Sequence, residues 1–97
     1  MPAPVRITLR WFLDPQGRMI VRSDDLRSLK PRYVRAFYRV SEAVGFRYEG
    51  GPSGQRSADP DAPLALIRGL MAEGFEVCGV SQGEIFVYNG LPPGHDT

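Results

Sequence analysis

Histidine and cysteine, two residue types that often carry out catalysis, each occur once in this sequence. The single histidine, His95, lies in a C-terminal tail that we expect to be disordered, so an acid/base pair or a triad built on histidine is not expected. The single cysteine, Cys78, has no histidine near it in the sequence and shares its predicted strand with Glu76, whose charge would raise the pKa of the thiol. The sequence therefore predicts a protein that is not an enzyme and has no catalytic residue.

Acidic and glycine-rich stretches do not match a cofactor or metal site either. Asp24 and Asp25, like Asp59 and Asp61, precede predicted helices, where carboxylates cap free N–H groups. The glycine-rich stretch 50–57 lacks the lysine–hydroxyl pair of a phosphate-binding loop, and we interpret it as an irregular surface loop. One cysteine excludes an internal disulfide framework and a multi-cysteine metal site. We expect no cofactor and no metal.

Arginine and aromatic side chains are the residues best suited to contact a partner. One set should lie on the uncovered face of a predicted sheet, with arginines from its first two strands and rings from its first and last strands. These residues are Arg6, Arg10, Phe12, Arg22, Phe86 and Tyr88. A second set, Arg32, Arg35 and Arg39, is spaced by three and four residues and forms a row along one predicted helix.

Three kinds of partner would fit these surfaces. Arginines and aromatic rings are frequent anchors of protein interfaces, so a protein partner is the principal prediction. A second copy could instead pair the acidic C-terminal hairpin of one chain with the basic N-terminal hairpin of the other, giving a homodimer through the sheet face. Single-stranded nucleic acid could stack on the rings, although Glu76 and Glu84 on the same face would repel phosphates. We predict a small binding or regulatory module, an inhibitor or adaptor, and nucleic-acid binding is the alternative function.

Length and charge predict one small soluble domain. Ninety-seven residues can enclose a single modest core, and we expect residues 1–90 to form it and residues 91–97 to be disordered. No stretch has the length of a membrane helix, and the N-terminus lacks the order of a secretion signal, which predicts a cytoplasmic protein. Residues 1–50 hold ten Lys/Arg and five Asp/Glu, a charge of +5, whereas residues 51–97 hold two and six, a charge of −4. We interpret the asymmetry as two halves that neutralise each other, and an anionic partner for the first half is the alternative.

A strand over residues 5–13 organises the predicted fold. Its odd-numbered residues are Val5, Ile7, Leu9, Trp11 and Leu13, an alternation that puts five apolar side chains on one buried face. The residues 14–17 predict a three-residue hairpin loop that Gly17 closes with a positive φ. The expected register pairs Leu13 with Met19 and Arg10 with Arg22.

Two helices follow, and each ends at a glycine followed by phenylalanine. The first begins at Pro31 and buries a stripe of Tyr33, Phe37, Val40 and Val44 before it ends at Gly45. The second buries a face that consists of Leu64, Leu66, Ile67, Leu70 and Met71. Strands are expected over 46–49, 75–80 and 84–88, and a three-residue turn at 81–83 pairs Val77 with Val87 and turns Phe86 and Tyr88 outward. The order β-β-α-β-α-β-β predicts an α+β fold, a two-layer α/β sandwich with both helices on one face of a mixed sheet of about five strands.

Part of this pattern resembles a known toxin family. Residues 66–77, with Gln82-Gly83 and residues 85–88, are similar to the helix-glycine-phenylalanine-strand-turn-strand core of the HicA mRNA-cleaving toxins. That family carries its catalytic histidine just after the turn glycine, where this sequence has Glu84 and Ile85. The resemblance therefore implies a shared supersecondary pattern without the ribonuclease activity.

Overall fold

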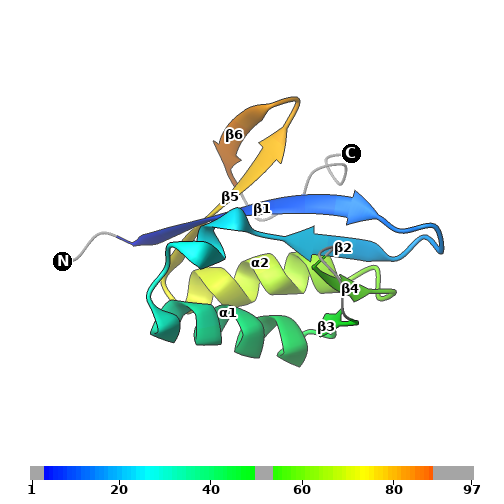
Figure 1. Cartoon of the computed structure of the whole chain (residues 1–97), viewed down its shortest axis with the longest axis horizontal. Coiled ribbons are helices and arrows are strands. Elements are labelled where there is room, and N and C mark those ends of the chain that lie inside the picture. The colour runs from blue at the N-terminus through cyan, green and yellow to red at the C-terminus, as the bar shows by residue number, and fades with distance from the viewer. Residues whose placement is uncertain (1–3, 50–53, 89–97) are drawn as a thin grey trace.

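A computed structural model describes residues 4–49 and 54–88 of the chain (Figure 1). In chain order these residues form β1 (Val5–Leu13), β2 (Met19–Arg22), a 3-10 turn η1 (Asp24–Arg27), α1 (Pro31–Ala43), β3 (Arg47–Tyr48), β4 (Gln55–Ser57), α2 (Ala62–Ala72), β5 (Phe75–Ser81) and β6 (Glu84–Val87). Their strands make one mixed sheet of order β3-β4-β2-β1-β5-β6. The predicted α+β fold is confirmed, with six described strands instead of about five. His95 and the predicted tail over 91–97 lie outside the described residues.

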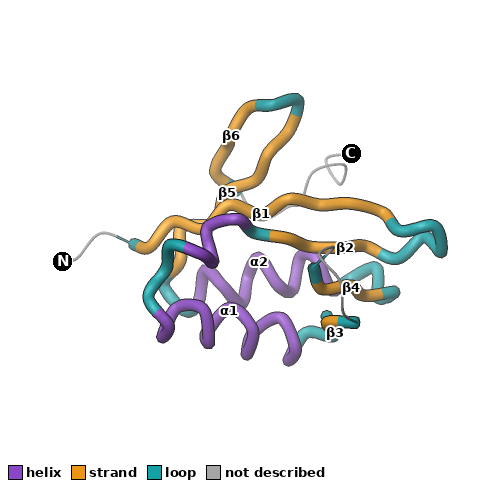
Figure 2. The backbone as a smooth tube through the Cα atoms, in the orientation of Figure 1, coloured by secondary structure: helices purple, strands orange, loops and turns teal. Residues whose placement is uncertain are grey.

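The sheet and the helices form two layers. Both helices lie on the same side of the sheet, and the turn of the β5–β6 hairpin projects away from them (Figures 1 and 2). At the centre, β1 runs parallel to β5, with Ile7 paired to Val77. The side chains of Ile7 and Leu9 are fully buried and belong to the same hydrophobic core as Leu66 and other residues of α2. The alternation of β1 thus places one row of side chains in the core and the other on the side without helices.

The first hairpin has the register expected from the sequence. Leu13 pairs with Met19 and Arg10 with Arg22, and the loop is closed by a hydrogen bond from the Asp14 N–H to the Arg18 carbonyl at 2.9 Å. Gly17 has a φ of +81°, which is the conformation that the loop requires. One expectation is wrong, because Leu13 is exposed where the hairpin tip extends past the helix layer (Figure 1).

The helices begin and end largely as predicted. α1 begins at Pro31, and Gly45 and Gly74 follow the two helices with φ of +105° and +96°. The helices approach each other closely at Gly69 of α2, where a Cβ would lie 2.6 Å from the Cγ1 of Val40, so a larger residue there would have to displace the Val40 side chain. Met71, predicted to be in the core, is instead exposed.

The strand β4 replaces part of the predicted surface loop over 50–57. It lies between β2 and β3, and its polar residues pair with both neighbours. Residues 50–53 of the predicted loop lie outside the described residues. Ion pairs join β4 and the residue after β3 to the first hairpin. They involve four residues, which we call the Asp14 cluster: Asp14, Arg18, Glu49 and Arg56.

The Asp14 carboxylate is the buried centre of this cluster. Burial alone would raise its pKa, but hydrogen bonds from the backbone and side chain of Arg18 outweigh that effect, and the pKa of Asp14 is lowered. The Nε of Arg18 lies 2.7 Å from its Oδ2, and the same oxygen lies 3.5 Å from Nη1 of Arg56. The negative charge of Asp14, which directly follows β1, therefore binds Arg56 of β4 as well as Arg18. The sequence alone does not predict this association of β4 with the first hairpin.

Candidate functional site

The sheet surface opposite the helices is the surface predicted to contact a partner, and we call it the open face. It carries the even-numbered side chains of β1, the residues paired with them on β2, and the outer side chains of β6. The residues considered are Arg6, Arg10, Phe12, Arg22, Ile85 and Val87. Phe12 is 47% exposed there, whereas Ile20, which pairs with it on β2, is buried.

The arginines of the open face already have carboxylate partners within the domain. Nη2 of Arg6 lies 2.7 Å from Oε1 of Glu76, and this hydrogen bond raises the pKa of Arg6. Arg10 and Arg22, which face each other across β1 and β2, both lie 3.4 Å from Asp24, one on each carboxylate oxygen. The repulsion expected between paired arginines is thus relieved by η1, which carries Asp24.

Two predicted contact residues, Phe86 and Tyr88, do not face outward, and that prediction is wrong. Val87 pairs with Cys78 instead of Val77. The turn contains two residues, Gln82 and Gly83, with φ of +53° and +81°, and not three. A shift of one residue moves every side chain of a strand to the other face. Ile85 and Val87 therefore take the outward positions.

Tyr88 is part of the core, and Phe86 packs beside it. Tyr88 is 3% exposed, and its hydroxyl accepts a hydrogen bond from Nε1 of Trp11 on β1. Burial raises its pKa well above that of a free tyrosine. The rings of Phe86 and Tyr88 meet edge to face at 5.2 Å over Gly79, where a Cβ would lie within 3 Å of both rings. Trp11 and Gly79 are the signals in the sequence that favour this register.

The helix arginines lie on the exposed side of α1 as predicted, but they are not equivalent. Arg39 forms an ion pair with Glu73 just after α2, and Arg32 lies 4.8 Å from the centre of the Tyr33 ring. Arg35 forms no ion pair with a described residue. The pairs Arg6–Glu76 and Arg39–Glu73 join the basic half of the chain to the acidic half. Arg10, Arg18 and Arg22 instead pair with carboxylates of their own half, so the predicted neutralisation between the halves is only partial among the described residues.

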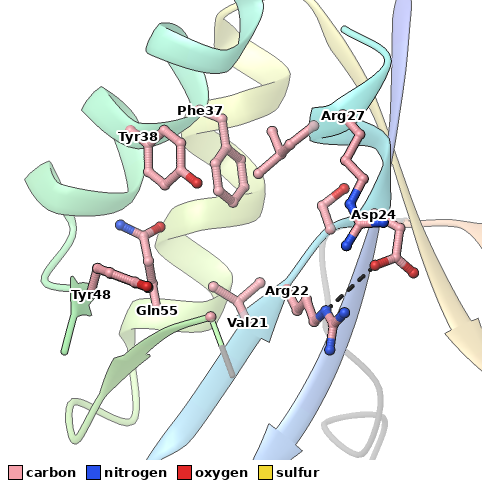
Figure 3. Close-up of a pocket in the computed structure, with 11 residues that line it drawn as sticks. Val21, Arg22, Asp24, Arg27, Phe37, Tyr38, Tyr48 and Gln55 are labelled. Carbon is pink, nitrogen blue, oxygen red and sulfur yellow. Dashed lines mark ion pairs between the residues drawn. The ribbon is translucent and has the colours of Figure 1, made fainter. Parts of the chain in front are cut away.

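A second candidate site lies between α1, η1 and the strands β2 and β4, and sequence reasoning missed it (Figure 3). This pocket, the α1–β4 pocket, has a volume of about 290 Å³. Its lining consists of Val21, Arg22, Ser23, Asp24, Leu26, Arg27, Phe37, Tyr38, Tyr48, Gly54 and Gln55. Ser23 precedes η1 and forms no side-chain cap bond with it. The residues 54 and 55 were expected in an irregular loop, so nothing in the sequence placed them beside a helix.

The remaining chemical features are few within residues 4–49 and 54–88. No three histidine, cysteine, aspartate or glutamate side chains in these ranges gather closely enough to hold a metal ion. Cys78 is buried, and burial raises the pKa of its thiol although Arg6 opposes the effect. Neither described helix is long and apolar enough to cross a bilayer. Comparisons with protein-family models, with characterised proteins and with solved structures find no match to this chain.

Proposed function

We propose that this chain is a non-enzymatic binding module that holds a protein partner through the free edge of β6 and the adjoining open face. The observation that carries the proposal is the exposure of Ile85 and Val87, at 62% and 56%, on the last described strand of the sheet. Two large aliphatic side chains on an edge strand place an apolar surface beside backbone groups that pair with no other described strand. Such edges accept an extended segment of a partner as an additional strand.

The backbone of β6 is oriented to receive that strand. The N–H of Tyr88 donates to the Val77 carbonyl on β5 at 2.9 Å. Bonded and non-bonded pairs alternate along an antiparallel ladder, so Phe86 and Glu84 also turn their backbone groups toward β5. The N–H and C=O groups of Ile85 and Val87 consequently point outward, and their side chains flank the position of an added strand.

The chemistry of the edge defines the segment that fits it. Ile85 and Val87 favour apolar side chains at alternate positions of the partner, since cross-strand neighbours share one face. Glu84 is exposed and has no ion pair within residues 4–49 and 54–88, whereas Glu76 is held by Arg6. We therefore expect a basic side chain in the partner beside Glu84.

The paired arginines support a protein partner more than a nucleic acid. Phosphates on the open face would have to displace Glu76 from Arg6 and Asp24 from Arg10 and Arg22. At the rim of a protein interface, these arginines can contact the partner while they stay paired with their carboxylates. The proposal includes a cytoplasmic location, to which an unpaired cysteine is suited, and a role as an inhibitor or adaptor of a larger partner.

Proline at position 87 tests the edge. Val87→Pro removes an outward N–H and leaves the hydrogen bonds to β5 in place, because the Val87 N–H does not face β5. Val87→Thr is the control, since it keeps the N–H and a branched side chain. Each tagged variant is first shown to be folded by circular dichroism. A protein captured from the source cells should then be retained by wild type and Val87→Thr and lost with Val87→Pro, and a synthetic segment of that protein should bind with the same ranking.

A second copy of the chain or a nucleic acid as the partner would give different results with these variants. Retention of the protein by all three chains would contradict the proposal. Light scattering that shows a doubled mass, abolished by Val87→Pro, would make the partner a second copy of the chain. Binding to a random oligonucleotide that weakens steeply with salt and is lost with Arg35→Glu, but not with Val87→Pro, would replace the proposal with nucleic-acid binding.

A further inference from the structure

We infer that the α1–β4 pocket binds a small planar nitrogen heterocycle of nucleobase size that donates a hydrogen bond to Gln55. This site is separate from the β6 edge, and the inference does not depend on a protein partner. The pocket volume of about 290 Å³ is close to the lower end for small-molecule sites.

Unsatisfied polar atoms give the pocket its chemistry. The Oε1 of Gln55 and the Oγ of Ser23 have no hydrogen-bond partner among the described protein groups, although these residues are 3% and 8% exposed. Buried polar atoms are nearly always paired, because an unpaired acceptor loses its hydration without compensation. Both residues line the same pocket, and the Gln55 amide is directed toward the Tyr38 ring (Figure 3). A ligand with an N–H donor would supply the missing bond to Oε1.

Aromatic walls favour a flat ligand. The ring of Phe37 is buried at the base of the pocket, whereas Tyr38 and Tyr48 are exposed at its opening. Planar heterocycles stack on such rings. The backbone of Gly54 also lies close to the backbone of β2, since a Cβ at Gly54 would lie 2.4 Å from the Val21 carbonyl oxygen. Side chains are thereby kept out of this part of the wall.

The amide of Gln55 matches one heterocycle edge in particular. A glutamine amide offers an acceptor and a donor side by side, and this pair complements the amino group and adjacent ring nitrogen of adenine. At the rim, Arg22 and Arg27 stand near one carboxylate, Asp24, which leaves an excess of positive charge. A phosphate on a ribose attached to the base would therefore be tolerated, and the base itself is the recognised group.

Calorimetric and NMR titrations with adenine test the inference. We expect saturable binding to the full chain with a Kd of about 1 mM or lower and shifted amide signals at Ser23, Tyr38 and Gln55. Unsubstituted purine, which lacks the amino donor, should bind about five- to tenfold more weakly. Adenosine monophosphate should bind at least as tightly as adenine. If it binds while adenine does not, the site recognises phosphate and the inference is wrong.

Variants of Gln55 assign the contact. Gln55→Met removes the acceptor at similar volume, so adenine should bind no better than purine, and the stability of the variant should equal or exceed that of wild type. Arg35→Ala, on α1 but outside the pocket lining, and Val87→Pro, on β6, should leave adenine binding unchanged. Equal affinity for adenine and purine in wild type, or no saturable binding, overturns the inference. A large loss of stability in Gln55→Met would also overturn it, because the amide would then be satisfied within the folded chain.

Discussion

Substitution of Gly79 by alanine should destabilise the domain through the two rings of β6. A Cβ at this position would lie 2.7 Å from the Tyr88 hydroxyl oxygen and 2.8 Å from the Cζ atoms of Phe86 and Tyr88. Carbon atoms normally approach to about 3.5–4.0 Å. Both rings would have to move, and Tyr88 would shift from the indole N–H of Trp11 to which it is bonded.

The magnitude follows from three contributions. Overpacking of a filled core costs about 1–3 kcal/mol, and weakening the bond between Trp11 and Tyr88 costs about 0.5–1.5 kcal/mol more. Alanine in a strand regains about 0.5–1 kcal/mol relative to glycine. The free energy of unfolding should thus fall by about 2 kcal/mol, which corresponds to a decrease in Tm of roughly 8–16 °C for a domain of this size.

Urea unfolding followed by the fluorescence of Trp11, the single tryptophan, measures this loss. The control is the same substitution in a Tyr88→Leu background, which removes two of the three close contacts. Tyr88→Leu is itself destabilising, so the cost of Gly79→Ala is taken within each background, as in a double-mutant cycle. The cost should be clearly smaller without the tyrosine ring. An equal cost in both backgrounds, or no loss in wild type, would refute the packing argument.

Three further outcomes follow from the pKa shifts and contacts of single groups. Because the folded pKa of Asp14 is lowered, its stabilising effect is present above the ordinary value of 3.8 and is lost as pH falls through the folded pKa. The urea midpoints of wild type and Asp14→Asn should therefore differ at pH 7 and converge in acid, and a constant difference would contradict this. Tyr88→Phe should lower the free energy of unfolding by about 1 kcal/mol, and in an alkaline absorbance titration of wild type one tyrosine should ionise only as the fold is lost. Cys78 should react slowly with a thiol-specific disulfide reagent in the native chain and rapidly in urea, whereas rapid native labelling would show that β5 is more open than described.

The parts of the fold that the sequence predicted are those fixed by local signals. The alternation of β1, the loop ending at Gly17 and the helix stops at Gly45 and Gly74 each depend on residues close together in the chain. β4 was missed because Gln55-Arg56-Ser57 has no apolar alternation, and its strand exists through pairing with β2 and the charge of Asp14. Long-range contacts of this kind leave no pattern in a short window.

In the candidate sites too, local signals predicted some residues correctly, and long-range contacts determine the residues that were placed wrongly. The arginines of β1 and β2 lie where the register of the first hairpin places them. Phe86 and Tyr88 were misplaced because the segment Glu84–Tyr88 has large apolar side chains on both faces, so either turn length buries a plausible set. The observed register is favoured by Trp11, which lies far away in the sequence and donates a hydrogen bond to the Tyr88 hydroxyl. The α1–β4 pocket depends on β4, and it could not be predicted once that strand was missed.

The pairing of β1 with β5 has a consequence for the order in which the chain is made. These two strands form the centre of the sheet, yet the residues that bridge them, such as Arg6 and Glu76, are seventy positions apart. At roughly 5–20 residues per second on the ribosome, β1 waits on the order of 4–14 s for its neighbour. During that interval the edge of β1 that later pairs with β5 has no neighbouring strand, and an open strand edge can pair with another chain. Fragments that stop before β5 should therefore aggregate or require a chaperone.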